Sequence, residues 1–410
     1  MNKLNFRTMR NKFLFAMTIA AALFTSCGED GTADIVINDN SVTNNTTNNT
    51  NGGGNTGNQG QTIELNGTYT TNLTLDAANT YTITGPTVIE DGATLTIPAG
   101  MVIKAAATGA DVYLAVAQGG KIIAEGTSSQ PIIFTSGANT PNSGDWGGLI
   151  LLGKAPVNSV TGSATATSEI GNLPYGGSEA DDNSGTLRYV RVEYSGGKAS
   201  GQSENNGFSF YGVGNGTIVE YIQMFEGADD GIEFFGGTVN VSNLSVVNSQ
   251  DDSIDWTEGY TGTITDAYVK HGVSHDKGIE ADGYNTDVGN NSNPIYFSKP
   301  TVTNLTIVGL GSGTGNEAIR LRAGTQGIFS NVKLEGFAEG FDLDGDSGDN
   351  PTGAGVLSGD LNVNSVIFVD VTVNMKNDTG ETFTEADFLT VDPNATGTDY
   401  ATWGAGWTRS

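Results

Sequence analysis

A column of charged side chains is the first feature of this sequence that suggests chemistry. Six short phrases, each with a polar or charged residue between two apolar ones, recur between positions 208 and 343. If successive phrases pair as neighbouring strands, their central side chains lie about 4.8 Å apart on one face. Carboxylates at that spacing repel one another by roughly 1 kcal/mol even in water, and a bound cation would offset the repulsion. The central residues are Ser209, Glu233, Asp255, Glu280, Arg320 and Asp342.

Two interpretations of this ladder are open. In the first, Glu233, Asp255, Glu280 and Arg320 line a groove that binds carbohydrate with the assistance of Ca²⁺, which prefers oxygen ligands. In the second, the ladder is a solvated face whose charges discourage edge-to-edge aggregation of strands.

A second acidic column precedes the same strands and contains an aspartate pair, Asp251 and Asp252. The phrase from Asn248 to Ile254 resembles the paired-aspartate turn of polygalacturonase-type glycoside hydrolases, which implies an acid and a base for glycoside hydrolysis. That family also uses a histidine, for which His271 and His275 are the candidates, although neither has the family's Gly-His-Gly flanks. Aspartates also suit turn geometry, so a purely structural role is the alternative and no catalytic residue is assigned.

A third acidic segment follows the last of the phrases. Asp342, Asp344, Asp346 and Asp349 place oxygen atoms at near-alternate positions, and the segment resembles a calcium loop. It is not an EF-hand, because Ser347 replaces the glycine of position six and no glutamate stands at position twelve. We expect these four aspartates either to bind a metal ion or to form a polar turn.

These side chains need a scaffold that repeats at the spacing of the phrases. The first apolar residue of each phrase stands at 208, 232, 254, 279, 319 and 341, which gives steps of 24, 22, 25, 40 and 22 residues. A second apolar phrase, such as Asn243-Leu244-Ser245-Val246, recurs in phase with the first. Two strands that alternate every 22–25 residues describe the coils of a parallel β-helix. The long step accommodates a loop inserted at Thr286–Pro300, and the first apolar residues should stack inward.

The N-terminal half carries less regular copies of the same pattern. Segments such as Gly92-Ala93-Thr94-Leu95 and Gly144-Asp145-Trp146-Gly147-Gly148 look like coils of right-handed parallel β-helix proteins of the pectin-lyase-like superfamily. The resemblance implies an all-β solenoid but no single activity, because that fold hosts lyases, hydrolases, adhesins and non-catalytic proteins. We predict a β-helix domain over 62–375 and a C-terminal cap over 376–410, in which the Trp403–Trp407 segment covers the last coil.

The N-terminus has the pattern of a targeting signal. Four basic residues precede the apolar run Phe13–Phe24, which is too short to span a bilayer and is typical of a signal peptide over 1–26. The segment Leu23–Cys27 resembles the lipobox of bacterial lipoproteins, which implies that Cys27, the sole cysteine, carries lipid. The following Glu29-Asp30 pair resembles a surface-export signal. The resemblance implies an outer-membrane lipoprotein exposed at the cell surface, and an ordinary secretory signal is the alternative.

Net charge and composition limit the classes of partner that the protein can bind. The chain has 46 acidic and 18 basic residues, and loss of the four basic residues of the signal gives 14 − 46 = −32 for the mature chain. Such a chain lacks the basic patches that bind a phosphate backbone, so we expect no nucleic-acid partner. Residues 27–61 begin acidic and continue in Asn, Thr, Gly and Gln, a composition that predicts a disordered tether.

The leading functional hypothesis is a lipid-anchored surface protein that binds extracellular polysaccharide or mediates adhesion without catalysis. Its partners would be the membrane, through the lipid, and the polysaccharide, and Ca²⁺ is the candidate cofactor. The alternatives are a polysaccharide-degrading hydrolase or lyase of the pectin-lyase-like fold, and a structural component of the surface layer.

Overall fold

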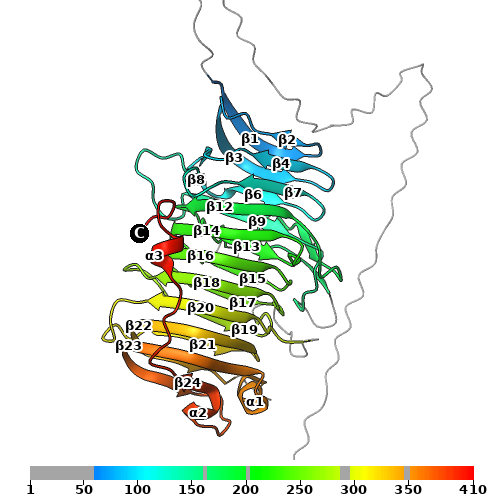
Figure 1. The fold of residues 1–410 in the computed structure, drawn as a ribbon. Coiled ribbons are helices and arrows are strands. Elements are labelled where there is room, and N and C mark those ends of the chain that lie inside the picture. The colour runs from blue at the N-terminus through cyan, green and yellow to red at the C-terminus, as the bar shows by residue number, and fades with distance from the viewer. Residues whose placement is uncertain (1–59, 160–163, 200–203, 287–295, 346–350) are drawn as a thin grey trace, which may run out of the picture. The chain divides into compact units, whose positions relative to one another are not determined.

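The β-helix predicted from the repeat is the architecture of the chain. Cys27, Asp346 and Asp349 lie outside the part that the structure describes, as do the predicted signal peptide and nearly all of the tether. Parallel strands stack coil upon coil in three columns, which confirms the right-handed parallel β-helix (Figure 1). Within the described part, no helix has the length and apolar character needed to cross a membrane. The computed structural model describes residues 60–159, 164–199, 204–286, 296–345 and 351–410.

The first column, here called the site sheet, carries the predicted ladder. It begins with the second parts of β1 and β3 and ends with the second part of β22, which pairs in turn with β23. Its strands are β1 (Thr62–Tyr69), β3 (Thr80–Ile89), β6 (Gly109–Val116), β9 (Trp146–Leu152), β13 (Phe208–Tyr211), β15 (Ile232–Phe235), β17 (Ile254–Thr257), β19 (Ile279–Asp282), β21 (Glu317–Arg322) and β22 (Gly327–Leu343).

The second and third columns share a set of long strands that bend from one column into the other. The second column starts with β2 (Leu73–Thr74), β4 (Thr94–Ile97) and β7 (Lys121–Glu125). The third starts with the first parts of β1 and β3, followed by β5 (Val102–Ala105) and β8 (Ile132–Ser136). The long strands are β12 (Gly185–Glu193), β14 (Ile218–Gly227), β16 (Asn240–Ser249), β18 (Thr263–Lys270), β20 (Thr301–Val308), β22 and β23 (Leu361–Asn377).

In every long strand except β23, a single residue with left-handed backbone makes the bend. The φ angles of these residues lie between +50° and +57°, a region that Asn and Asp tolerate better than most residues. Each is the first residue of the second repeating phrase, so the polar start of that phrase marks a corner of the coil. The bend residues are Tyr189, Tyr221, Asn243, Asp266, Asn304 and Asn331.

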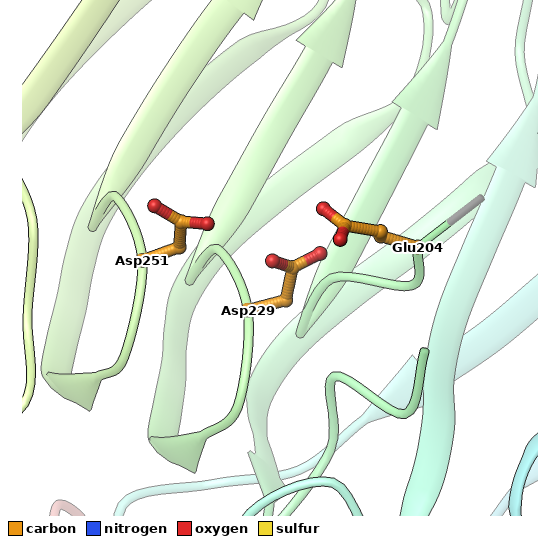
Figure 2. A group of neighbouring side chains, drawn as sticks. All are labelled: Glu204, Asp229 and Asp251. Atoms are coloured by element: carbon orange, nitrogen blue, oxygen red, sulfur yellow. The ribbon is translucent and has the colours of Figure 1, made fainter. Parts of the chain in front are cut away.

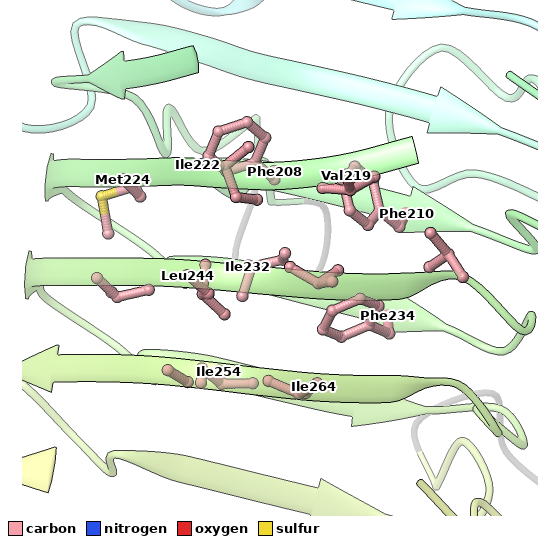
Figure 3. Close-up of a cluster of buried hydrophobic side chains, with 14 of the residues drawn as sticks. Phe208, Phe210, Val219, Ile222, Met224, Ile232, Phe234, Leu244, Ile254 and Ile264 are labelled. Atoms are coloured by element: carbon pink, nitrogen blue, oxygen red, sulfur yellow. The ribbon is translucent and has the colours of Figure 1, made fainter. Parts of the chain in front are cut away.

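The core fills the space between the three columns. The first apolar residue of each phrase pairs with its counterpart on the next coil and is fully buried, as predicted (Figure 3). Trp256 is also fully buried, and its indole N–H donates to the Thr325 hydroxyl at 3.0 Å. A smaller apolar cluster lies outside the coils around Tyr175 and Tyr211, beneath the antiparallel pair β10 (Thr165–Thr167) and β11 (Pro174–Gly176).

The C-terminal residues divide into two parts. The predicted boundary at residue 375 falls inside β23, and strand pairing continues to β24 (Leu389–Val391). The buried ring of Phe388, from α2 (Glu385–Phe388), packs edge-on against Phe341 at 5.3 Å near the end of the core. The helix α1 (Pro351–Ser358) lies beside β23.

Residues 392–410, here called the C-terminal strap, do not cover the last coil as predicted for Trp403–Trp407. They run back along the outer face of the third column (Figure 1), where α3 (Tyr400–Trp403) contacts β18 and its Tyr400 hydroxyl lies 3.3 Å from Ser245 of β16. The Tyr400 ring stacks on Tyr268 at 3.8 Å, and the Trp407 ring meets Tyr189 edge-on at 5.4 Å. The aromatic face of these strands holds Trp407 against Tyr189 and Tyr221, and Trp403 packs on Tyr400 and Trp407.

Candidate functional site

The predicted ladder lies on the site sheet in continuous register. Pairing of successive strands joins Ser209, Glu233, Asp255, Glu280, Arg320 and Asp342. The ladder is nevertheless not a solvated face, because Glu280 and Asp342 expose only 9% and 4% of their surface. The acidic turns that precede each strand lie beside the ladder and enclose it. The interpretation as a groove is therefore the one that the burial favours.

The second acidic column ties consecutive coils together through backbone hydrogen bonds. The Asp252 backbone N–H donates to the Asp230 carboxylate at 2.9 Å. One coil further on, the Lys277 backbone N–H donates to the Asp252 carboxylate at 2.6 Å. Asp230 and Asp252 are both buried, so they form a structural link between turns and at the same time place charge beside the ladder.

A third row of acids closes the cleft at its outer rim. Figure 2 shows Glu204, Asp229 and Asp251 side by side on consecutive turns. The Lys198 ammonium lies 2.9 Å from Glu204 and 3.0 Å from Asp229. Burial lowers the pKa of Lys198, but its hydrogen bonds with these two carboxylates outweigh that effect and raise it. Glu204 belongs to a loop outside the repeat, and sequence reasoning missed it for that reason.

Together these rows form a cavity of about 310 Å³, here called the acidic cleft. Ten acidic side chains and three basic ones line it, so its walls carry a large excess of negative charge. The lining residues are Glu169, Glu204, Asp229, Asp230, Glu233, Asp251, Asp252, Asp255, Asp276, Lys277, Glu280, Arg320 and Arg322.

Each basic residue of the cleft forms ion pairs with neighbouring carboxylates, and Lys277 and Arg322 lie close to the same one, Glu280. Lys277 lies 2.5 Å from Asp276 and 3.1 Å from Glu280. Arg322 lies 2.7 Å from Glu280 and 2.6 Å from Asp282. Burial opposes their charge, but the neighbouring carboxylates raise the pKa of Lys277 and of Arg322. Lys277 begins one repeated phrase and Arg322 directly follows another, so their place beside the ladder followed from the register, although the sequence analysis did not select them.

Arg320, predicted as a ligand-binding residue, faces the other end of the ladder. Its guanidinium is hydrogen bonded to Asp344, and Glu317 lies 3.7 Å away. The arginine stands between Glu280 and Asp342 in the register and thus separates the carboxylates of the main cleft from those around Asp342.

Burial and mutual repulsion shift the protonation of the carboxylates. Burial, followed by the charge of Glu280, raises the pKa of Asp255 and of Asp252 well above the usual range. Burial and the neighbouring Asp255 do the same to the pKa of Glu233. Burial and Glu204 raise the pKa of Asp229 to about 7. With a pKa of about 7, Asp229 is partly protonated at neutral pH, and a divalent cation bound beside it would displace that proton.

The donor atoms of the cleft fit Ca²⁺. Three side chains, Asp252, Asp255 and Glu280, present carboxylate oxygens within 4.8 Å of one another, and so do Asp230, Glu233 and Asp255. A cluster made of oxygen ligands alone, with several carboxylates, suits Ca²⁺ rather than Zn²⁺, which prefers nitrogen and sulfur. Asp255 would belong to both sets, and no described residue forms a hydrogen bond or ion pair with its carboxylate.

The predicted calcium loop is a different kind of cluster. Asp342 and Asp344 come together with Asp378, a residue that the sequence analysis did not select, and their oxygens lie within 4.8 Å of one another. Lys376 lies 3.4 Å from Asp342 and 3.0 Å from Asp378, and Arg320 pairs with Asp344. Burial and Asp344 raise the pKa of Asp342 to about 6. With two cations on three carboxylates, this cluster has far less uncompensated charge than the acidic cleft.

The four candidates for catalysis do not converge. Asp251 and Asp252 line the acidic cleft, whereas His271 lines a separate cavity beyond the turns. His275 is the next residue after Ser274, which lines that second cavity. The Nδ1 atom of His275 lies 2.9 Å from the Asp276 carbonyl oxygen. The two imidazole rings stack at 4.2 Å. Neither histidine is among the residues that line the acidic cleft, so the structure offers no histidine there for the aspartate pair.

A parallel β-helix with a charged cleft over one sheet defines a class of proteins rather than one activity. The chain belongs to the pectate-lyase-like β-helix domain family, whose family model matches residues 67–408. Searches of curated proteins and of solved structures gave no match. Membership confirms the superfamily resemblance deduced from the N-terminal coils.

Proposed function

We propose that this protein is a lipid-anchored cell-surface protein that binds Ca²⁺ in its acidic cleft and holds an extracellular polysaccharide there. The observation that supports the proposal most strongly is the composition of one partly enclosed cavity, which is lined by ten acidic side chains and only three basic ones. Carboxylates packed this closely favour either protonation or a bound cation. The family supports a polysaccharide ligand at the level of the fold, and the lipid anchor rests on Cys27 in its lipobox-like segment.

The cleft repeats its chemistry along the stack, which suits a polymer of repeating units. Asp230, Asp252 and Lys277 occupy successive turns, and Glu233, Asp255 and Glu280 occupy successive strands. Bound Ca²⁺ would supply positive charge and coordination positions to sugar oxygens in a cleft that otherwise repels acidic sugars. The protein itself would contribute two things: the carboxylates that hold the ion, and the positive charges of Lys277 and Arg322 along one side of the cleft.

Calcium titration of purified protein tests the proposal. Millimolar Ca²⁺ should raise the melting temperature, since an ion in hundredfold excess over its dissociation constant stabilises the folded state by about 2.7 kcal/mol. Asp255→Asn should weaken this response, and Asp111→Asn, at an exposed carboxylate outside the cleft, should leave it unchanged. A melting temperature that Ca²⁺ does not move in the wild-type protein would overturn the Ca²⁺ part of the proposal.

Polysaccharide binding needs its own measurement. A glycan array probed with and without EDTA should show binding that depends on Ca²⁺ and that falls with Asp255→Asn. Uronic-acid polymers are the expected ligands, because their carboxylates need the ion to enter a negative cleft. Binding that is equal in EDTA would contradict the proposed role of the ion.

A second candidate, a glycoside hydrolase, is favoured by one observation. Asp229, with its pKa raised to about 7, can hold a proton at neutral pH next to Glu204 and Asp251, and that is the pattern of an acid beside a base. A lyase is less favoured, because Lys277 is kept protonated by its neighbours and a charged amine cannot act as a base. Chain shortening of a polysaccharide that is abolished by Asp229→Asn would establish the hydrolase, and its absence would leave binding as the function.

A further inference from the structure

The outer face of the site sheet changes character along the stack. From β15 onward it carries the charged ladder, whereas on the three strands before β13 the equivalent residues are apolar. Pairing of successive strands leads from Val88 through Ala115 and Ile150 to Ser209. These four side chains alternate with core residues along their strands, yet none exposes more than 7% of its surface. The sheet is therefore covered from outside up to β13, and the acidic cleft begins where this cover ends.

The β10–β11 hairpin is this cover. Its residues Ile170 and Tyr175 form one apolar cluster with the outer side chains of β3, β6 and β9. Hydrogen bonds fix its base, because the Gly176 backbone N–H donates to the Gly153 carbonyl oxygen at 2.9 Å. The Gln118 side-chain N–H donates to the same carbonyl oxygen at 2.7 Å. The hairpin is thus packed and hydrogen bonded in place over this part of the sheet.

The tip of the hairpin brings Glu169 to the first carboxylates of the cleft. Glu169 lines the cleft and accepts a hydrogen bond from the Glu204 backbone N–H at 3.3 Å, so the hairpin and the loop of Glu204 meet. Glu204 is the end of its row in Figure 2. Burial, Asp255 and Glu169, in that order, raise the pKa of Glu233, which places Glu169 beside the first acid of the ladder. This end of the cleft is therefore a wall with carboxylates in front and apolar packing behind.

The opposite end of the cleft is polar and reaches solvent. The register leads from Arg320 to Asp342 and then to Lys376. The side chains of Arg320 and Lys376 expose 30% and 41% of their surface, in contrast to the buried apolar row at the other end. Between the wall and Arg320 the cleft spans four coils, or three steps of about 4.8 Å, which leaves room for a few sugar units.

We propose that the acidic cleft binds the end of a polysaccharide chain rather than its interior, with the terminal sugar unit against Glu169 and Glu204 and the rest of the chain leaving over Arg320. This inference rests on the polysaccharide binding proposed above and specifies which part of the polymer enters the cleft. A terminal unit retains a hydroxyl group that an internal unit has lost to its glycosidic bond, and carboxylate oxygens accept hydrogen bonds from such a group. An internal unit in the same place would have to continue its chain through the packed hairpin.

Oligogalacturonates with one modified end test the inference. Borohydride reduction alters the reducing end alone, and a terminal unit that has lost its free hydroxyl by elimination alters the non-reducing end alone. In Ca²⁺, isothermal titration calorimetry should show that one of the two modifications weakens binding by about tenfold, the equivalent of a hydrogen bond to a charged group, and that the other has little effect. An affinity that neither modification changes would overturn the inference.

A matched pair of variants tests the wall. Glu169→Ala should reduce the discrimination between intact and modified ends, whatever its effect on the overall affinity. Glu179→Ala, at an exposed carboxylate outside the cleft, should preserve that discrimination. Equal discrimination by Glu169→Ala and the wild type would overturn the role given to Glu169.

The number of protein molecules bound to each chain is an independent measurement. Sedimentation velocity with excess protein should give one protein per oligogalacturonate, however long the oligomer is. A number that grows with chain length would overturn the inference and leave the function proposed for the cleft standing. Absence of any oligogalacturonate binding in Ca²⁺ would overturn both.

Discussion

Asp252 and Asp255 are neighbours in the same cleft, yet they have different physical roles. The Asp252 carboxylate accepts the backbone N–H of Lys277 and so helps to hold the next turn in place. The Asp255 carboxylate has no hydrogen-bond or ion-pair partner among the described residues. Substitution of Asp252 therefore alters the fold as well as the charge, whereas Asp255 reports on the charge alone. For this reason Asp255, rather than the aspartate pair, is the residue at which cation binding is best measured.

At the residue scale, Asp229 makes stability depend on pH. The unfolded carboxyl has its usual pKa of 3.8, and the folded one titrates near 7, so between these values the folded state holds a proton that the unfolded state has lost. Lowering the pH from about 7 to about 4 should therefore raise the free energy of unfolding, measured by urea denaturation in EDTA. Asp229→Asn should make this slope shallower, with the other buried carboxylates supplying the remainder, and Asp111→Asn should keep it. A wild-type slope of the opposite sign would contradict the prediction.

At the scale of the element, the bends of the long strands carry a ladder of their own. The Asn304 side-chain N–H donates to Asp266 at 3.0 Å, and its oxygen accepts from the Asn331 amide at 2.8 Å. These bonds join three coils at the corner between the second and third columns. The strands between the corners thus take their register from polar residues as well as from the apolar core.

Asn304→Ala tests this ladder. The substitution removes both hydrogen bonds and leaves a residue that tolerates the φ of +57° less well, so we expect a loss of about 1–3 kcal/mol in the free energy of unfolding. Asn304→Gly should lose the hydrogen bonds but relieve the backbone strain, and chemical denaturation of both variants separates the two contributions. Equal stability of the alanine variant and the wild type would exclude a role for the ladder.

At the scale of the whole domain, the C-terminal strap joins the end of the chain to coils in the middle of the solenoid. The Arg409 backbone N–H donates to Gln223 at 2.7 Å, and its guanidinium lies 4.2 Å from the centre of the Phe225 ring. The Thr398 backbone N–H donates to the Thr306 hydroxyl at 3.0 Å. The strap thus contacts coils that are far apart along the solenoid, whose own contacts are between neighbours.

Trp407→Ala should loosen the strap. Its ring is almost completely buried, and truncation of a buried tryptophan costs about 3–5 kcal/mol in many proteins. We expect a lower melting temperature and rapid proteolytic cleavage after residue 391, with the remaining β-helix still folded by circular dichroism. Trp407→Phe, which keeps most of the apolar area, should lie close to wild type. Resistance of the alanine variant to protease would show that the strap is held elsewhere.

Membrane attachment is the prediction that depends on the N-terminus. Cys27→Ala should abolish incorporation of labelled palmitate and release the protein from the membrane fraction, because a lipid is the proposed anchor. Cys27→Ser, which retains size and polarity, serves as a matched variant. Unchanged labelling of either variant would refute the lipobox interpretation.

The sequence alone determined the repeat, the inward stack of apolar residues such as Ile254 and Ile279, and the register of the acidic ladder. These features follow from local periodicity, because a strand alternates its faces and a solenoid places equivalent residues one above another. The sequence also shows that the second phrase often begins with a polar residue, such as Asn243 or Asn304. Only the backbone geometry shows that this residue adopts a left-handed conformation and bends the strand.

Tertiary structure decided which charged residues share one environment. Glu204 reaches the acidic cleft from a loop with no repeat, where Lys198 pairs with it, and Asp378 joins Asp342 from beyond β23. No spacing in the sequence predicts these residues. Burial decided that the ladder is a cleft, that His271 is neutral, and that the terminal tryptophans lie along the third column. Such outcomes depend on which surfaces are brought together after the coils have stacked, and local periodicity carries no information about that step.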